Sequence, residues 1–251
     1  MEKIEMLGIE MHSATMAETV AWLDTRIAER EFTQHVVVNV AKIVNMRRDR
    51  VLSDSVRSCD IVNIDGMGVV WAARLLGHEV PERVSGVDLF GELVRLAALN
   101  EYPVFLLGGK EEVVEKVVHT LRKRHPDLKI AGYHHGYFWE DEEALVQKIH
   151  DSGARLLFVA ITSPKKENFI NRWKDSLGVN FVMGVGGTFD VVAGRVKRAP
   201  VWMQKSGLEW LYRVIQEPRR MWKRYLVTNC LFAAMMFRER LRMRKYGLHG
   251  G

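Results

Sequence analysis

A carboxylate and a carboxamide stand at the ends of apolar runs that are typical of buried strands. Asp65 comes directly after residues 61–64, which read IVNI, and Asn39 lies near the end of residues 35–40, HVVVNV. A carboxylate in such a position can accept a proton as a general base. It can also cap the helix that follows, because Asp at a strand-to-helix turn commonly accepts backbone N–H bonds. Residue type and position alone leave both roles of Asp65 open.

Glycine and other turn residues follow the remaining apolar runs. Glycine lets a turn adopt positive φ and lets a ligand approach the backbone closely. Their joint recurrence favours a phosphate-bearing ligand held by backbone N–H groups and helix N-termini, although each glycine alone is equally explained by a tight turn. The positions are Gly108, Gly109, Tyr137 in segment 134–138, Thr162, and Gly186, Gly187 and Asp190 in segment 184–190.

The well-known phosphate and metal motifs do not occur in this sequence. The segment LLGGKEEV (106–113) lacks the full GxGxxG fingerprint, and no GxxxxGK[ST] is present. The two cysteines fit no metal spacing, the pair His134-His135 has no third ligand placed by spacing, and we find no Asp-x-Asp pair. We therefore expect neither a dinucleotide site nor a P-loop, and no metal site.

The elements that must position these residues alternate along the chain. Short runs rich in Val and Ile are separated by amphipathic segments such as 111–125 and 142–153. This alternation predicts an α/β fold with a Rossmann-like parallel sheet and helices on both faces. Ligands of such sheets bind beyond the carboxyl ends of the strands, where the residues named above lie. The expected strands are 35–40, 61–64, 104–109, 128–133, 155–161 and 179–187.

The positive charge of the chain is confined to its last quarter. The 251 residues carry a net charge of +6, but residues 195–251 hold 14 Lys and Arg against 3 Asp and Glu, which leaves 23 against 28 before them. Such a localised basic segment points to an anionic partner, which could be phosphate, nucleic acid or anionic lipid, or else to a solvated surface.

The basic segment also has an apolar character. Residues 208–247 interleave Trp, Tyr, Leu, Met and Phe with Arg and Lys, a pattern that suits a helix lying in the interface of an anionic membrane. The alternative is a helix pair packed on the domain with its cations in water. We divide the chain into an α/β domain, 1–195, and a basic, amphipathic helical appendage, 196–251. No window supplies the roughly 20 apolar residues of a membrane span, and the N-terminus predicts no signal peptide.

Six segments resemble the WecG/TagA/CpsF glycosyltransferases, glycosyltransferase family 26. They occur in the family's order and with its spacing over nearly the whole chain. The segments are 65–90 (DGMGVVWAARLLGHEVPERVSGVDLF), 104–109 (VFLLGG), 132–138 (GYHHGYF), 163–167 (SPKKE), 184–200 (GVGGTFDVVAGRVKRAP) and 207–225 (GLEWLYRVIQEPRRMWKRY).

The resemblance implies an inverting, metal-independent hexosyltransferase that needs no cofactor. Its donor would be a UDP-sugar carrying N-acetylmannosamine, its uronic acid or another hexose, and its acceptor a polyprenyl-pyrophosphate-linked sugar in cell-surface polysaccharide synthesis. It further implies a cytoplasmic protein peripheral on the inner face of the bacterial membrane, with an anionic lipid surface and homo-oligomers as partners. The competing hypothesis is a non-catalytic nucleic-acid-binding module that uses the basic tail; under the resemblance no nucleic acid is expected.

The resemblance also implies roles for individual residues. Asp65 matches the proposed base, Asn39 lies near the donor sugar and the acceptor, and Arg83 is expected near the acceptor. The chain departs from the family at Val37, where many members carry Thr, and in TSPKKE for GSPKQE, which bears on the sugar that is bound. Donor-binding positions are Gly108, Gly109, Tyr137, Thr162, Lys166, Glu167, Gly186, Gly187 and Asp190, and the pyrophosphate positions in the appendage are Arg213, Arg220 and Arg224.

Overall fold

The computed structural model describes residues 1–246, apart from the side chains of Arg220 and residues 244–246. Its centre is an eight-stranded sheet in the order β1-β2-β4-β3-β8-β7-β5-β6. All neighbouring pairs are parallel except β1 and β2, which confirms the predicted α/β class. The strands are β1 (Glu2–Met6), β2 (Ile9–Ser13), β3 (Thr33–Val38), β4 (Ile61–Ile64), β5 (Val104–Gly108), β6 (Ile130–His134), β7 (Leu156–Ala160) and β8 (Phe181–Gly184).

The antiparallel hairpin of β1 and β2 was not among the expected strands. Its two-residue turn, Leu7-Gly8, has positive φ at both positions, 54° and 71°, as short hairpin turns require. Alternation of buried and exposed residues, such as buried Ile4 and Met6 on β1, is the pattern of an edge hairpin with one covered face. The hairpin joins the sheet where His12 pairs with Asn63 of β4.

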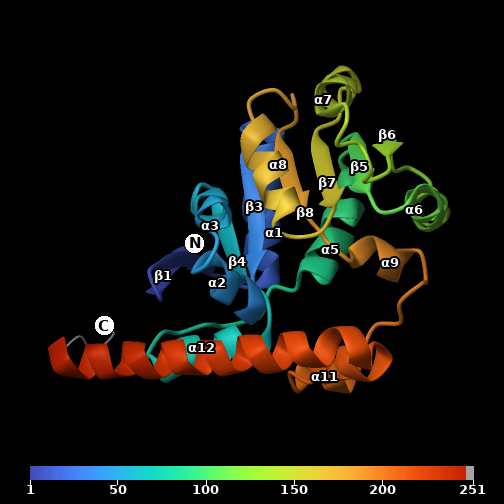
Figure 1. Cartoon of the computed structure of the whole chain (residues 1–251). Coiled ribbons are helices and arrows are strands. Elements are labelled where there is room, and N and C mark those ends of the chain that lie inside the picture. Colours follow the sequence, from blue (N-terminus) through green and yellow to red (C-terminus); the bar gives the residue numbers. More distant parts are fainter. Residues whose placement is uncertain (247–251) are drawn as a thin grey trace.

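Helices cover both faces of the sheet, as Figure 1 shows. On one face α1, α5, α6 and α9 pack over β5, β7 and β8, and on the other face α2, α3, α4, α7 and α8 complete the cores. These helices are α1 (Met16–Ala28), α2 (Val40–Met46), α3 (Arg50–Arg57), α4 (Met67–Leu75), α5 (Gly86–Leu99), α6 (Glu111–Arg124), α7 (Glu142–Asp151), α8 (Lys165–Trp173) and α9 (Thr188–Val192).

The basic tail is helical, as predicted, and forms α10 (Val201–Lys205), α11 (Glu209–Gln216) and α12 (Pro218–Tyr246). In Figure 1, α12 runs beneath the α/β core, and α11 lies beside its first half. Phe232 and Met236 of α12 are buried in the same apolar cluster as α2, α3 and α4. Within residues 1–246, no helix has the length and apolarity needed to cross a bilayer.

Candidate active site

The two predicted catalytic residues stand side by side at the carboxyl ends of neighbouring strands. Val38 of β3 pairs with Ile64 of β4, so Asn39 and Asp65 each come one residue after a paired position. The Asp65 N–H donates to the Val38 carbonyl at 2.8 Å and continues the ladder. Gly66 has a φ of +106°, and a Cβ there would lie 3.7 Å from the Asn39 Cβ. A Cβ would fit here in ordinary contact, so it is the positive φ that favours glycine at this turn.

Asp65 does not cap the helix that follows it. The residue before α4 is Gly66, and no side chain caps that helix. Burial raises the pKa of the Asp65 carboxyl, Arg83 opposes the rise, and Glu209 adds to it. Arg213 and the Gly86 backbone N–H, which begins α5, also lower this pKa. The carboxylate thus faces charges of both signs and is a stronger base than an exposed aspartate.

Asn39, in contrast, is a helix cap. Its side-chain oxygen accepts from the Lys42 backbone N–H at 3.0 Å and begins α2. The cap fixes the orientation of the carboxamide at the end of β3 and leaves its nitrogen as a hydrogen-bond donor.

Three arginines from distant parts of the chain meet one carboxylate beside Asp65. Glu209 Oε2 accepts from Arg83 Nη1 at 3.0 Å, and its Oε1 lies 3.4 Å from Arg213 Nη2 and 3.9 Å from Arg198 Nε. We call these four residues, Arg83, Arg198, Arg213 and Glu209, the arginine cluster. The sequence analysis placed Arg83 and Arg213 in one site, and the structure brings them together. Arg198 and Glu209 were not predicted from the sequence.

Arg198 is anchored a second time, on α5. Its guanidinium makes a two-point contact with Asp88, one arm reaching Asp88 Oδ2 at 2.7 Å. This hydrogen bond raises the pKa of Arg198, and its Nε atom is buried without a hydrogen-bond partner among the described residues. The segment between α9 and α10 is thereby tied to the core next to Ser85, which lies 3.4 Å from Arg198 Nη2.

The remaining predicted arginines lie on α12. The charge of Arg224 acts on Lys166 at the edge of the sheet and on Tyr225, whose phenol pKa is raised mainly by burial. Arg224 therefore lies close to the predicted donor residues. Arg220 also belongs to α12, but its side chain lies outside the described residues.

Lys166 and Glu167 form a buried ion cluster with Lys42, a residue that the sequence did not single out. Glu167 Oε1 lies 2.7 Å from Lys42 Nζ and 2.6 Å from Lys166 Nζ, and the three side chains are at most 8% exposed. We call these residues the lysine cluster. Burial works to raise the pKa of Glu167, but the two ammonium groups lower it to about 2. Burial together with Lys42 lowers the pKa of Lys166 to about 8.

Gly108, the last residue of β5, is required by close packing, and Gly109 follows it. Gly108 has a φ of +125°, and a Cβ there would lie 2.4 Å from the Ala160 carbonyl oxygen. The Gly109 carbonyl accepts from the Gly136 N–H at 2.8 Å, which draws the loop after β6 to the end of β5. Tyr137 on that loop and Thr162 after β7 are both exposed. These positions therefore line the open edge of the sheet.

Gly186 and Gly187 form the turn into α9, and Asp190 lies within that helix. The run 179–187 is longer than β8, which ends at Gly184, because Gly186 leaves the strand with a φ of +53°. The backbone carbonyl of Asp190 accepts from the Arg195 N–H at 2.8 Å and from the Val196 N–H at 3.1 Å. Asp190 thus helps to direct the chain from α9 toward the appendage.

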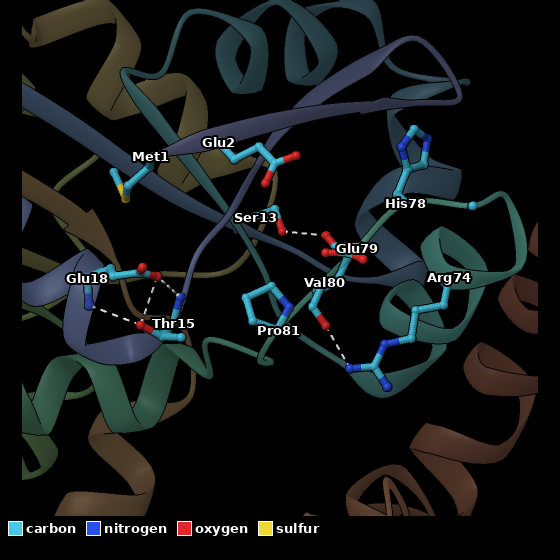
Figure 2. A pocket seen from close by; sticks show the side chains of 11 residues that line it. Met1, Glu2, Ser13, Thr15, Glu18, Arg74, His78, Glu79, Val80 and Pro81 are labelled. Carbon is cyan, nitrogen blue, oxygen red and sulfur yellow. Dashed lines mark hydrogen bonds between the residues drawn. The ribbon is translucent and has the colours of Figure 1, made fainter. Parts of the chain in front are cut away.

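A groove of about 800 Å³ lies at the end of β2, away from the lysine cluster. Figure 2 shows how its walls are bonded: Ser13 Oγ donates to the Glu79 carbonyl at 2.6 Å, and Arg74 Nη2 donates to the Val80 carbonyl at 2.6 Å. These bonds hold the loop before α5, which carries Arg83. None of the predicted site residues lines this groove.

Comparison with known proteins identifies the class of enzyme. The profile described as "Glycosyl transferase WecG/TagA/CpsF family" matches residues 4–246. An N-acetylglucosaminyldiphosphoundecaprenol N-acetyl-beta-D-mannosaminyltransferase of Bacillus subtilis is 38% identical over 179 residues, covering 71% of this chain and 69% of that protein. The enzyme of the same description from Staphylococcus aureus strain MW2 is 32% identical over 224 residues, covering 88% and 86%.

The chain is therefore a glycosyltransferase of the hexosyltransferase class. Within that class it belongs to the WecG/TagA/CpsF family, and the resemblance seen in its motifs is confirmed.

Proposed function

We propose that the chain transfers a sugar from a UDP-sugar to a sugar linked to polyprenyl pyrophosphate, with inversion and without a metal ion. The observation that carries this proposal is the position of Asp65 beside Arg83 and Arg213, a base next to cations at the ligand-binding edge of a parallel sheet. The activity printed for the relatives, transfer of N-acetylmannosamine to an undecaprenyl-diphosphate-linked N-acetylglucosamine, is the first reaction to test.

In the proposed reaction Asp65 takes the proton of the acceptor hydroxyl. The hydroxyl oxygen attacks the anomeric carbon from the face opposite UDP, and the bond from that carbon to the UDP oxygen breaks with its electron pair leaving on UDP. The raised pKa of Asp65 supports its role as base. Arg213, Arg220 and Arg224 are proposed to neutralise diphosphate charge, as cations do for a leaving phosphate.

The donor is proposed to lie along the ends of β5 to β8. Asn39, whose side-chain oxygen caps α2, would offer its nitrogen to the sugar. The lysine cluster adds a net positive charge close to Arg224, which suits a diphosphate. The other proposed donor contacts are Gly108, Gly109, Tyr137, Thr162, Gly186, Gly187 and Asp190.

We also propose that residues 196–251 act as an appendage that seats the enzyme on the inner face of the membrane. Trp222, Leu226 and Phe237 of α12 are exposed among Arg and Lys, and interfacial helices combine these residue types. Trp222→Ser with Phe237→Ser should weaken sedimentation with anionic liposomes, whereas Val51→Ser with Leu99→Ser, two equally exposed apolar changes on α3 and α5, should not. Equal sedimentation of all three proteins would contradict this assignment.

The function itself is tested with a panel of UDP-sugars and a synthetic short-chain polyprenyl-diphosphate N-acetylglucosamine. We expect UDP release only with both substrates, persistence of the reaction in EDTA, and inversion at the anomeric carbon by NMR. Absence of transfer from every UDP-sugar would contradict the proposal. Stabilisation in thermal shift by RNA but not by UDP would favour the nucleic-acid-binding hypothesis, and that binding would weaken steeply with salt.

A further inference from the structure

Glu209 is the meeting point of three parts of the chain. Its carboxylate contacts Arg83 from the loop before α5, Arg198 from the segment before α10, and Arg213 one turn further along α11. The Glu209 side chain is only 13% exposed, so these guanidinium groups are its surroundings in place of water. A buried carboxylate persists only when such partners compensate for its lost hydration.

Three arginines and three carboxylates meet in this region. Arg83, Arg198 and Arg213 face the carboxylates of Glu209, Asp88 and Asp65, three of each sign. Since Asp88 and Asp65 belong to the α/β core and Glu209 to α11, these charges come together only when α11 lies on the core.

A carboxylate that binds arginine side chains also orients their guanidinium groups. Arginine presents donors in a rigid planar fork, so contact with Glu209 fixes where the free arms of Arg83 and Arg213 point. Both arginines also act on the Asp65 charge, as does Glu209. The same residue therefore determines the placement of two cations and adds a negative charge near the proposed base.

We propose that Glu209 is a positioning residue of the transfer reaction, which holds Arg83 and Arg213 in their orientation beside Asp65. This inference rests on the proposed function and extends it: assembly of the site depends on one carboxylate of α11 as well as on the arginines that meet the substrate. Glu209 contacts no reacting atom in this scheme and works through its neighbours.

The direction of a pH effect follows from the groups around Asp65. Removing the negative charge of Glu209 takes away one influence that raises the pKa of Asp65. This change lowers that pKa, so the acid limb of the turnover profile should move to lower pH. The charged and titratable groups that face Asp65 are Arg83 from the loop before α5, Arg198, Glu209 and Arg213 from the appendage, and Tyr225 from α12.

The experiment compares full-length wild type, Glu209→Gln, Glu209→Asp and the control Glu92→Gln, which removes a carboxylate from the exposed Glu92–Arg95 pair on α5. We expect Glu209→Gln to lower kcat by about 10²-fold at neutral pH, as small misplacements of catalytic groups do, and to shift the acid limb downward. Glu209→Asp should regain most of kcat and the limb, and Glu92→Gln should match wild type.

A readout independent of turnover is the 13C NMR titration of the Asp65 carboxyl, which should give a lower pKa in Glu209→Gln than in wild type. An unchanged titration, or a loss of kcat that keeps the wild-type acid limb and is not rescued by Asp, would overturn the inference. In either of these outcomes the wild-type protein still transfers sugar. If the proposed function itself were wrong, the wild-type protein would transfer no sugar.

Discussion

The two ion clusters at the carboxyl edge of the sheet differ in burial and in the way they are built. The lysine cluster joins α2 and α8 within the core, and its side chains are almost fully buried. The arginine cluster spans the core and α11; Arg83 and Glu209 in it are 14% and 13% exposed, but Arg213 is 47% exposed. Buried ion pairs fix geometry at the expense of hydration, while exposed ones contribute little stability and can exchange partners.

This difference separates two tasks. The lysine cluster is suited to keep the ends of β3, β7 and β8 in place, because breaking it would leave charges unpaired in a dry interior. The arginine cluster is suited to meet an anionic ligand, because water and substrate can compete for its more exposed members. Changes in the first should lower stability and, because Lys166 and Glu167 are proposed donor contacts, donor binding as well, whereas changes in the second should appear mainly in turnover.

The largest effect is expected at Asp65. Asp65→Asn keeps the size of the side chain but removes the base, so transfer should fall by about 10²–10⁴-fold while UDP binding and thermal stability remain. In wild type, turnover should rise with pH as Asp65 loses its proton, and this limb should vanish in the variant. Near-normal turnover by Asp65→Asn would show that Asp65 is not the base.

The lysine cluster is broken most directly by Glu167→Ala. Two buried ammonium groups would lose their counter-ion, and the free energy of unfolding should fall by about 3–5 kcal/mol in urea denaturation. The exposed pair offers a control, since Glu92→Ala should change it by less than about 1 kcal/mol. Similar values for both variants would contradict the expected difference between a buried ion cluster and an exposed ion pair.

Acid should act on the lysine cluster through Glu167. Its pKa of about 2 in the folded chain lies below its ordinary value of 4.5, so the unfolded chain binds a proton first as pH falls. The stabilisation is complete above about pH 4.5 and is lost as pH falls toward 2. The unfolding free energies of wild type and Glu167→Gln should therefore converge by about 2 kcal/mol between pH 7 and pH 3. A constant difference would contradict this ion-pair assignment.

The smallest effect on stability is expected in the arginine cluster. Arg213→Gln removes one half-exposed partner of Glu209, and the free energy of unfolding should change by less than about 1 kcal/mol. Transfer should nevertheless fall by about tenfold, because the cation lies near both Asp65 and the proposed diphosphate. A variant that is clearly destabilised yet fully active would reverse the division of tasks.

Much of the α/β core could be predicted because it follows continuous apolar runs. The run 61–64 coincides with β4, and the rule that parallel strands end at one edge placed Asn39 beside Asp65. The hairpin of β1 and β2 was not predicted, because its apolar and polar residues alternate and its turn is marked only by Gly8. The helices of the tail were recognised from their mixture of apolar and basic residues.

The ion clusters could not be read from the sequence. Lys42 lies 125 residues from Glu167, and Arg83 lies 126 residues from Glu209, so their contacts depend on how helices dock. The segment 207–225 drew attention to its arginines, whereas Glu209 resembles any carboxylate in the first turn of a helix. Glu209, which contacts three arginines in the structure, therefore could not be distinguished in this basic segment of the sequence.

The path of α12 across the end of the sheet has a kinetic consequence. An enzyme seated on a bilayer by the exposed side of this helix would meet its lipid-linked acceptor by lateral diffusion in two dimensions. Diluting that acceptor with other lipids would slow the reaction even when the total amount in the test tube is constant. Because Phe232 and Met236 fix α12 on the core, the orientation of this helix on the bilayer would determine the side from which the acceptor reaches the site.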